Sequence, residues 1–178
     1  MARPDPLGIR AASAGILAAT DRVRIVPEGV GRVASRLLEA EPPGRPVWDD
    51  GWHFTGPKDL LVHYVLILDT LNHCFWPGQP RWTVPGPDGH PVNGYRAMAL
   101  ALRRRFDEGL VDLLDAERLC RMDRERLAWI LGGQGELPWM DERAAHLREV
   151  GAWIRKRGAF EECIAAAEGS AVAVVRQV

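Results

Sequence analysis

The chain has 178 residues, of which 47% are hydrophobic and 26% charged. This length and composition are typical of a folded globular protein and exclude a disordered or fibrous chain. Lysine and arginine number 23 against 24 aspartate and glutamate residues, a net charge of -1, which argues against nonspecific binding to nucleic acid or anionic membranes. The three cysteines, Cys74, Cys120 and Cys163, are too widely spaced for a disulfide framework or a zinc site. We therefore expect no metal and no cofactor.

The sequence carries no sign of secretion or membrane insertion. Its first ten residues contain Pro4, Asp5 and Pro6, and no apolar core follows a basic start as in a signal peptide. The apolar run over residues 65–68 is interrupted by Asp69 and is far shorter than the ~20 residues of a membrane span. We therefore expect a cytoplasmic protein with no membrane partner.

Apolar residues recur at the spacing of amphipathic helices along most of the chain. We expect helices over residues 7–20, 27–38, 60–75, 95–108, 115–122, 123–131 and 138–157, with one or two more in residues 160–178. Residues 82–84 and 91–92, joined by a turn rich in proline and glycine, predict a small hairpin. The expected architecture is a single, mainly α domain over residues 1–178 with one β-hairpin.

Between the second and third predicted helices lies a loop, residues 44–56, that is unusually aromatic for a surface connector. Trp52, His53 and Phe54 follow one another in it. Large aromatic side chains are costly to leave in water. They therefore either form one wall of a binding site or plug the end of the helical core.

A second group of chemically distinctive residues falls near the end of the predicted helix over residues 60–75. This helix is apolar on nearly every face, yet it contains Asp69 and Asn72 followed by Phe75 and Trp76. Helical spacing places Asp69 on one face with Asn72 and His73. Buried polar groups need partners. Either Asp69 pairs with His73 or an arginine and Asn72 caps a carbonyl, or the two groups bind a ligand.

An acid and an amide beside flat rings suit a purine-like base, whose edge offers hydrogen-bond donors and whose face stacks. His53 and Phe54 would supply the opposite wall. Asn93, Gly94 and Tyr95 lie at a predicted helix start, where free N–H groups either bind an anion such as phosphate or only cap the helix. The residues themselves therefore favour a small nucleotide or base as ligand, not a nucleic-acid polymer.

The end of the sequence is apolar. Residues 171–175 read Ala-Val-Ala-Val-Val, and such a segment is stable only if something packs over it. We expect a further segment or a second chain to pack on residues 171–178.

Several motifs, in order, resemble the queuosine salvage protein family. The most specific is the run Asp69-x-Leu71-Asn72-x-Cys74-Phe75-Trp76. The others are Val26-Pro27-x-Gly29-Val30, Gly94-Tyr95 followed by Ala97, Gly109, Leu137-Pro138, Glu142-Arg143 and Gly169-Ser170-Ala171. The resemblance covers nearly the whole chain but only the N-terminal portion of the longer family members.

This resemblance implies a helical fold like that of the helix-hairpin-helix DNA glycosylases and a nucleosidase that releases queuine from queuosine 5′-phosphate. The reaction is hydrolysis of an N-glycosidic bond without a metal. His53, Phe54, Asp69, Asn72, Phe75, Trp76 and Tyr95 are then the candidate base-binding residues. Asp69 is also a possible catalytic residue, although the family's catalytic aspartate is expected in a later segment that has no counterpart here. Two other interpretations stay open: a non-catalytic nucleobase-binding module and a helical protein-interaction domain.

Overall fold

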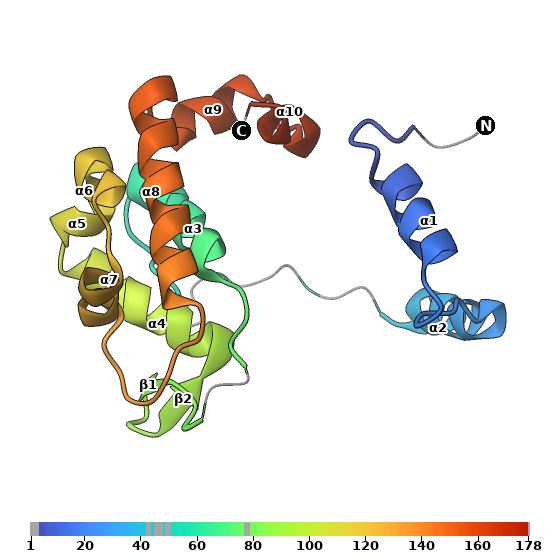
Figure 1. Cartoon of the computed structure of the whole chain (residues 1–178), viewed down its shortest axis with the longest axis horizontal. Helices are drawn as coiled ribbons and strands as arrows, with labels where there is room; N and C mark the ends of the chain where they lie inside the picture. Colours follow the sequence, from blue (N-terminus) through green and yellow to red (C-terminus); the bar gives the residue numbers. More distant parts are fainter. Residues whose placement is uncertain (1–3, 42–43, 45–47, 49–50, 77–78, 178) are drawn as a thin grey trace. The chain divides into compact units, whose positions relative to one another are not determined.

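The computed structural model describes residues 4–41, 44, 48, 51–76 and 79–177. It divides into two compact units, Met1–Pro46 and Val47–Val178. The first unit contains α1 (Ile9–Ala19) and α2 (Pro27–Glu39), which are drawn in blue in Figure 1. The expectation of one domain over residues 1–178 stays a prediction.

The two helices of the first unit leave their apolar side chains in water. Pro27 stands in the first turn of α2, as expected. Neither helix has a buried residue among those that the structure describes. A cavity of about 660 Å³ is lined by α1 together with Thr20, Val23 and Ile25. The described residues of this unit therefore present a large exposed apolar surface, which includes Ile16, Leu37 and Leu38.

The second unit is a helical assembly with one hairpin, which confirms the predicted mainly α class. Its helices are α3 (Lys58–Leu71), α4 (Gly94–Asp107), α5 (Val111–Leu114), α6 (Ala116–Cys120), α7 (Arg124–Leu131), α8 (Met140–Arg157), α9 (Phe160–Ala166) and α10 (Ala171–Val175). The long helix α8 contacts α3 on one side and α6 and α7 on the other (Figure 1). Within the described part of the chain, no helix is both long enough and apolar enough to cross a membrane.

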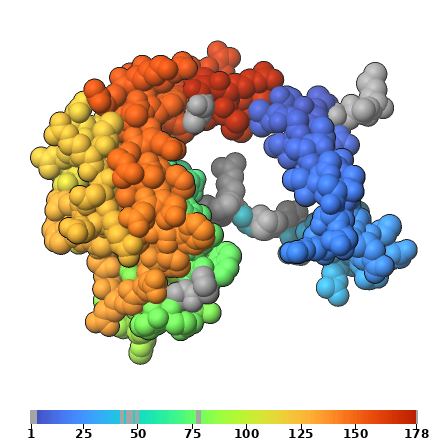
Figure 2. Space-filling model, in the orientation of Figure 1, coloured from blue at the N-terminus to red at the C-terminus, as the bar shows by residue number. Residues whose placement is uncertain are grey.

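The hairpin pairs β1 (Thr83–Pro85) with β2 (Pro91–Asn93) in antiparallel register, with Val84 opposite Val92. The loop before α8 docks on the same strand, because the Thr83 amide donates to the Gln134 carbonyl at 2.8 Å. In Figure 2 this orange loop lies against the green hairpin. Gly133 allows the close approach: its φ is 87°, and a Cβ there would lie 2.5 Å from the Thr83 carbonyl oxygen.

Side chains at two helix starts satisfy free backbone amides. The carboxylate of Asp115 accepts from the amide of Arg118 ahead of α6, and that of Asp123 accepts from the amide of Arg126 ahead of α7. The predicted helices over 115–122 and 123–131 are therefore confirmed, with each aspartate as the cap just outside the helix.

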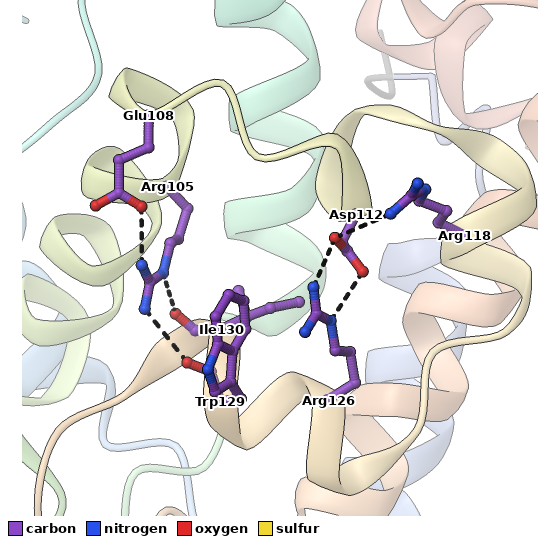
Figure 3. A network of polar contacts seen from close by, with 7 residues as sticks. All are labelled: Arg105, Glu108, Asp112, Arg118, Arg126, Trp129 and Ile130. Carbon is purple, nitrogen blue, oxygen red and sulfur yellow. Dashed lines mark hydrogen bonds and ion pairs between the residues drawn. The ribbon is translucent and has the colours of Figure 1, made fainter.

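Figure 3 shows the polar network that joins α4, α5, α6 and α7. Asp112 accepts two hydrogen bonds from the Arg126 guanidinium, both 2.8 Å long, and pairs with Arg118 at 3.4 Å. These bonds to Arg126 hold the pKa of the Asp112 carboxyl below its usual range. The guanidinium groups of Arg105 and Arg126 lie 5.1 and 4.1 Å from the centre of the Trp129 ring.

The core lies where α3, α4 and α8 meet. Tyr64 of α3 is fully buried, and its hydroxyl donates to the Ala99 carbonyl of α4 at 3.0 Å. His63 on the same helix bonds through Nε2 to the Leu113 carbonyl at 2.6 Å, which requires the Nε2–H tautomer. Burial lowers the pKa of His63. These contacts fix α3, the helix whose end carries the second predicted group of site residues.

One predicted boundary is wrong in a way that matters for the site. The helix expected over residues 60–75 ends at Leu71. Asn72 is its C-terminal cap, and residues 73–76 continue as irregular backbone. The face-sharing expected from helical spacing therefore does not hold beyond Leu71.

Candidate functional site

The aromatic loop and the start of α4 form one part of the candidate site. The His53 ring stacks on Trp48, with centroids 4.5 Å apart and planes 29° from parallel. Its Nε2 lies 2.7 Å from the Tyr95 hydroxyl in the first turn of α4. His53 is 9% exposed and Tyr95 40%, so the hydrogen-bonded pair reaches from the protein interior to solvent. Residues 45–47, 49 and 50 of the predicted loop lie outside the described residues.

Phe54 belongs to the core. It is 5% exposed, and its ring lies 5.8 Å from that of Tyr64 and 5.5 Å from that of Phe106. The Trp48 indole N–H donates to the Phe54 carbonyl at 2.8 Å, which ties the stacked pair to this anchor. Of the two interpretations of the Trp-His-Phe run, the structure favours a core plug for Phe54; His53 is also buried, and its exposed partner is Tyr95.

The predicted burial of Asp69 and Asn72 is wrong. Both residues are exposed, because α3 buries the face formed by Tyr64, Ile67, Leu68 and Leu71. Asp69 lies on the opposite side of the helix, and Asn72 lies at its end. The argument that two buried polar groups require a ligand therefore loses its premise, although both groups are accessible to one.

Two large aromatic residues, Phe75 and Trp76, follow three and four residues after Asn72. Phe75 is half-buried and packs against the core, while Trp76 is 66% exposed. Asn72, four residues before Trp76 in sequence, is also exposed; an exposed indole offers a stacking face, and an exposed carboxamide offers a hydrogen-bonding edge. This combination is what the recognition of a flat heterocycle requires.

The backbone of this segment is held by Arg143 of α8, which is fully buried. Its guanidinium donates to the carbonyls of Leu71, His73 and Cys74 and, through Nε, to that of Pro138 at 3.0 Å. It also lies 5.3 Å from the centre of the Phe75 ring. Burial lowers the pKa of Arg143 to about 10, so the side chain is still charged at neutral pH.

Cys74 shows how sharply the chain turns here. Its φ is 43°, a left-handed conformation that helix ends usually give to glycine or asparagine. Arg143 thus satisfies the carbonyl of Leu71, the last residue of α3, and those of His73 and Cys74 just beyond the helix. We name residues 71–76 and Arg143 together the Arg143 turn.

His73 of the Arg143 turn lies against His146 of α8. The rings of His73 and His146 are 5.2 Å apart, and Nε2 of His73 is buried without a hydrogen-bond partner in the described residues. Burial, followed by the charges of Arg143 and His146, lowers the pKa of His73. His146 also lines a cavity of about 520 Å³ with Leu66, Thr70, Glu149, Val150, Trp153 and Phe160.

Reasoning from the sequence missed Arg143 and Trp48 as parts of the site. Arg143 had a detectable signal: it falls among Met140, Ala144 and Leu147, the inward positions of α8, where a charged residue is unusual. Trp48 lies in the aromatic loop over residues 44–56, but its stacking on His53 leaves no periodic pattern that would single it out.

Comparison with known proteins agrees with this description. Residues 52–178 match the family model described as queuosine salvage protein. A Sphaerobacter thermophilus protein named queuosine 5′-phosphate N-glycosylase/hydrolase is 38% identical over 178 residues, covering 98% of this chain and 54% of that protein. Proteins of the same name from Nematostella vectensis and Mus musculus are 29% and 26% identical, covering 72% and 89% of this chain and 39% and 49% of their own lengths.

The chain thus spans about half the length of the curated relatives that it matches. The matched residues include the aromatic loop from Trp52 onward, the start of α4 and the whole Arg143 turn. On this similarity, the chain belongs to the queuosine salvage protein family.

Proposed function

We propose that this chain is the base-binding portion of an N-glycosidic hydrolase that acts on queuosine 5′-phosphate and releases queuine. The observation that carries the proposal is the 38% identity, over 98% of the chain, to a protein named for that activity. The ligand is then a small nucleotide or its base, in keeping with the chain's near-neutral net charge. The proposed compartment is the cytoplasm.

In this proposal the base is held by groups that reach solvent. Trp76 supplies a stacking face, and the Asn72 carboxamide supplies a hydrogen-bond donor and acceptor for the edge of the base. Tyr95, oriented by His53, supplies a hydroxyl. Phe54 and Phe75 support these groups from the core.

The chemistry needs a carboxylate. Cleavage of an N-glycosidic bond passes through a state in which the sugar carries positive charge, and a nearby carboxylate stabilises it or activates water. Asp69 is the candidate within this chain, because it is exposed one turn before Asn72. The expected resemblance to the DNA glycosylase fold stays a prediction.

A second candidate function is a base-binding module without hydrolytic activity. The observation that favours it is the coverage: the chain matches 54% of the Sphaerobacter thermophilus protein, so the residues that complete catalysis can lie in the unmatched part. We also propose that a further segment or second chain packs on residues 171–178, since Val175 of α10 is 57% exposed. Val178 itself lies outside the described residues.

The test is to incubate the purified chain with queuosine 5′-phosphate, measure free queuine by mass spectrometry, and measure queuine binding by calorimetry. Asp69→Asn is compared with Asp59→Asn, which changes an exposed carboxylate in the first turn of the same helix. Release that is lost only in Asp69→Asn supports hydrolysis by this chain. Saturable binding without release supports the module. The absence of both release and binding refutes the proposed function.

A further inference from the structure

Arg143 lies where a cation is expensive. A charge that is removed from water loses hydration, and the lowered pKa of Arg143 reflects that cost. Its neighbours on the inward face of α8 include Ala144 and Leu147, which are apolar. An apolar side chain at this position would avoid the penalty, so the guanidinium is retained for what it contacts.

The contacts converge on one short segment. Three of the carbonyls that accept from Arg143 belong to Leu71, His73 and Cys74, which lie around seventy residues earlier in the sequence. The guanidinium is planar and carries its donors in a fixed fork. Bonds from one rigid group to three carbonyls in a four-residue span fix the orientation of the intervening peptide planes.

We propose that Arg143 is a positioning residue for base recognition, setting the backbone of the Arg143 turn so that Asn72 and Trp76 face the ligand. This inference rests on the proposed function. A lysine cannot replace the arginine, because its single ammonium group cannot span three carbonyls with fixed geometry. Arg143 touches the backbone and not the ligand, so it acts through the two exposed side chains.

The first test is hydrogen exchange of the full chain carrying Arg143→Lys. The matched control is Arg148→Lys on the same helix. Among the residues that the structure describes, the Arg148 guanidinium donates to a single carbonyl, that of Met122, at 2.7 Å. We expect exchange to rise at least tenfold in a peptide covering residues 70–76 and to stay unchanged in α4. An equal rise in both regions means that the substitution only destabilises the fold and overturns the proposal.

The second test is a double-mutant cycle on queuine affinity. If Arg143 acts through Asn72, Arg143→Lys weakens binding at least tenfold, and Asn72→Ala then adds less than a twofold further loss. If the losses of queuine affinity in the two single variants multiply in the double variant, the inference is overturned. Unchanged affinity in Arg143→Lys overturns it as well, and neither result affects the proposed function. If the unsubstituted chain does not bind queuine, the proposed function and this inference both fail.

A variant that does not fold would obscure both tests. Should Arg143→Lys alone prove unfolded by circular dichroism, both tests are made in a Cys74→Gly background, because glycine adopts the left-handed φ of this position without strain. In that background the same local rise in exchange and the same coupling to Asn72 are expected. Their absence overturns the proposal there as well.

Discussion

Asn72→Ala separates a binding role from a structural one. Asn72 is exposed at the end of α3, and the hydrogen bond of this cap is made by its backbone amide to the Asp69 carbonyl, not by its side chain. Its φ of -83° is open to alanine. Substitution of an exposed residue with no buried contact changes the free energy of unfolding by no more than about 0.5 kcal/mol.

The expected effect on binding is larger. Removal of a carboxamide that pairs with a polar edge of the base leaves that edge without a hydrogen-bond partner, which costs about 1–3 kcal/mol of binding free energy. Since about 1.4 kcal/mol corresponds to a tenfold change, the dissociation constant for queuine should rise roughly 5- to 150-fold. The two magnitudes are far enough apart to be distinguished in one pair of experiments.

The assay is calorimetric titration of queuine alongside urea unfolding followed by circular dichroism. Gln134→Ala is the matched control, because it removes another exposed carboxamide, in the loop before α8. An affinity for queuine in Asn72→Ala that equals that of Gln134→Ala would refute the assignment of Asn72. A variant that is destabilised by more than 2 kcal/mol would refute the reading of Asn72 as an exposed cap.

Three further changes test other parts of the structure. Asp112→Asn should lower the free energy of unfolding at neutral pH, and its difference from the unsubstituted chain should shrink as pH falls below about 4. The reason is that Arg126 lowers the pKa of Asp112, so the stabilisation is lost when the carboxylate is protonated. If urea unfolding gives a constant difference from pH 7 to about 2.5, this cause is contradicted. Tyr95→Phe removes the hydroxyl bonded to His53 and should cost about 0.5–1.5 kcal/mol in urea unfolding, with queuine affinity lowered as well; unchanged affinity would remove the pair from the site. Gly151→Ala places a methyl group 2.7 Å from a backbone nitrogen of α6. Overpacking costs about 1–3 kcal/mol and the gain in helix propensity is about 1 kcal/mol, so the variant should be less stable. A raised melting temperature would show instead that α6 can move away.

Elements that depend on local signals could be predicted from the sequence. The hairpin follows from its turn residues, and the starts of α6 and α7 follow from Asp115 and Asp123, whose side chains cap the next turn. These predictions needed only neighbours within four residues. The short helix α5 was not predicted, because four residues carry too little periodicity to distinguish a helical turn from a loop.

The end of α3 could not be predicted in the same way. The apolar pattern continues through Phe75, and no glycine or proline interrupts it before residue 77. What ends the helix is visible only in three dimensions: the carbonyls of Leu71, His73 and Cys74 turn toward a guanidinium that the chain supplies from α8. A contact this distant in sequence leaves no local pattern, so tertiary structure overrides the periodicity.

The error over Asp69, by contrast, was avoidable. Successive helical residues are turned by about 100°, and Tyr64, Ile67, Leu68 and Leu71 cluster within one narrow arc. Asp69 falls well outside that arc, so its spacing already indicated an exposed carboxylate. Arg143 shows the converse, since its spacing from Met140 and Leu147 put a charge on a buried face. On an amphipathic helix, the charged residue that is in phase with the apolar stripe is the one whose partners need explanation. In this chain those partners are the backbone of the segment that presents Asn72 and Trp76.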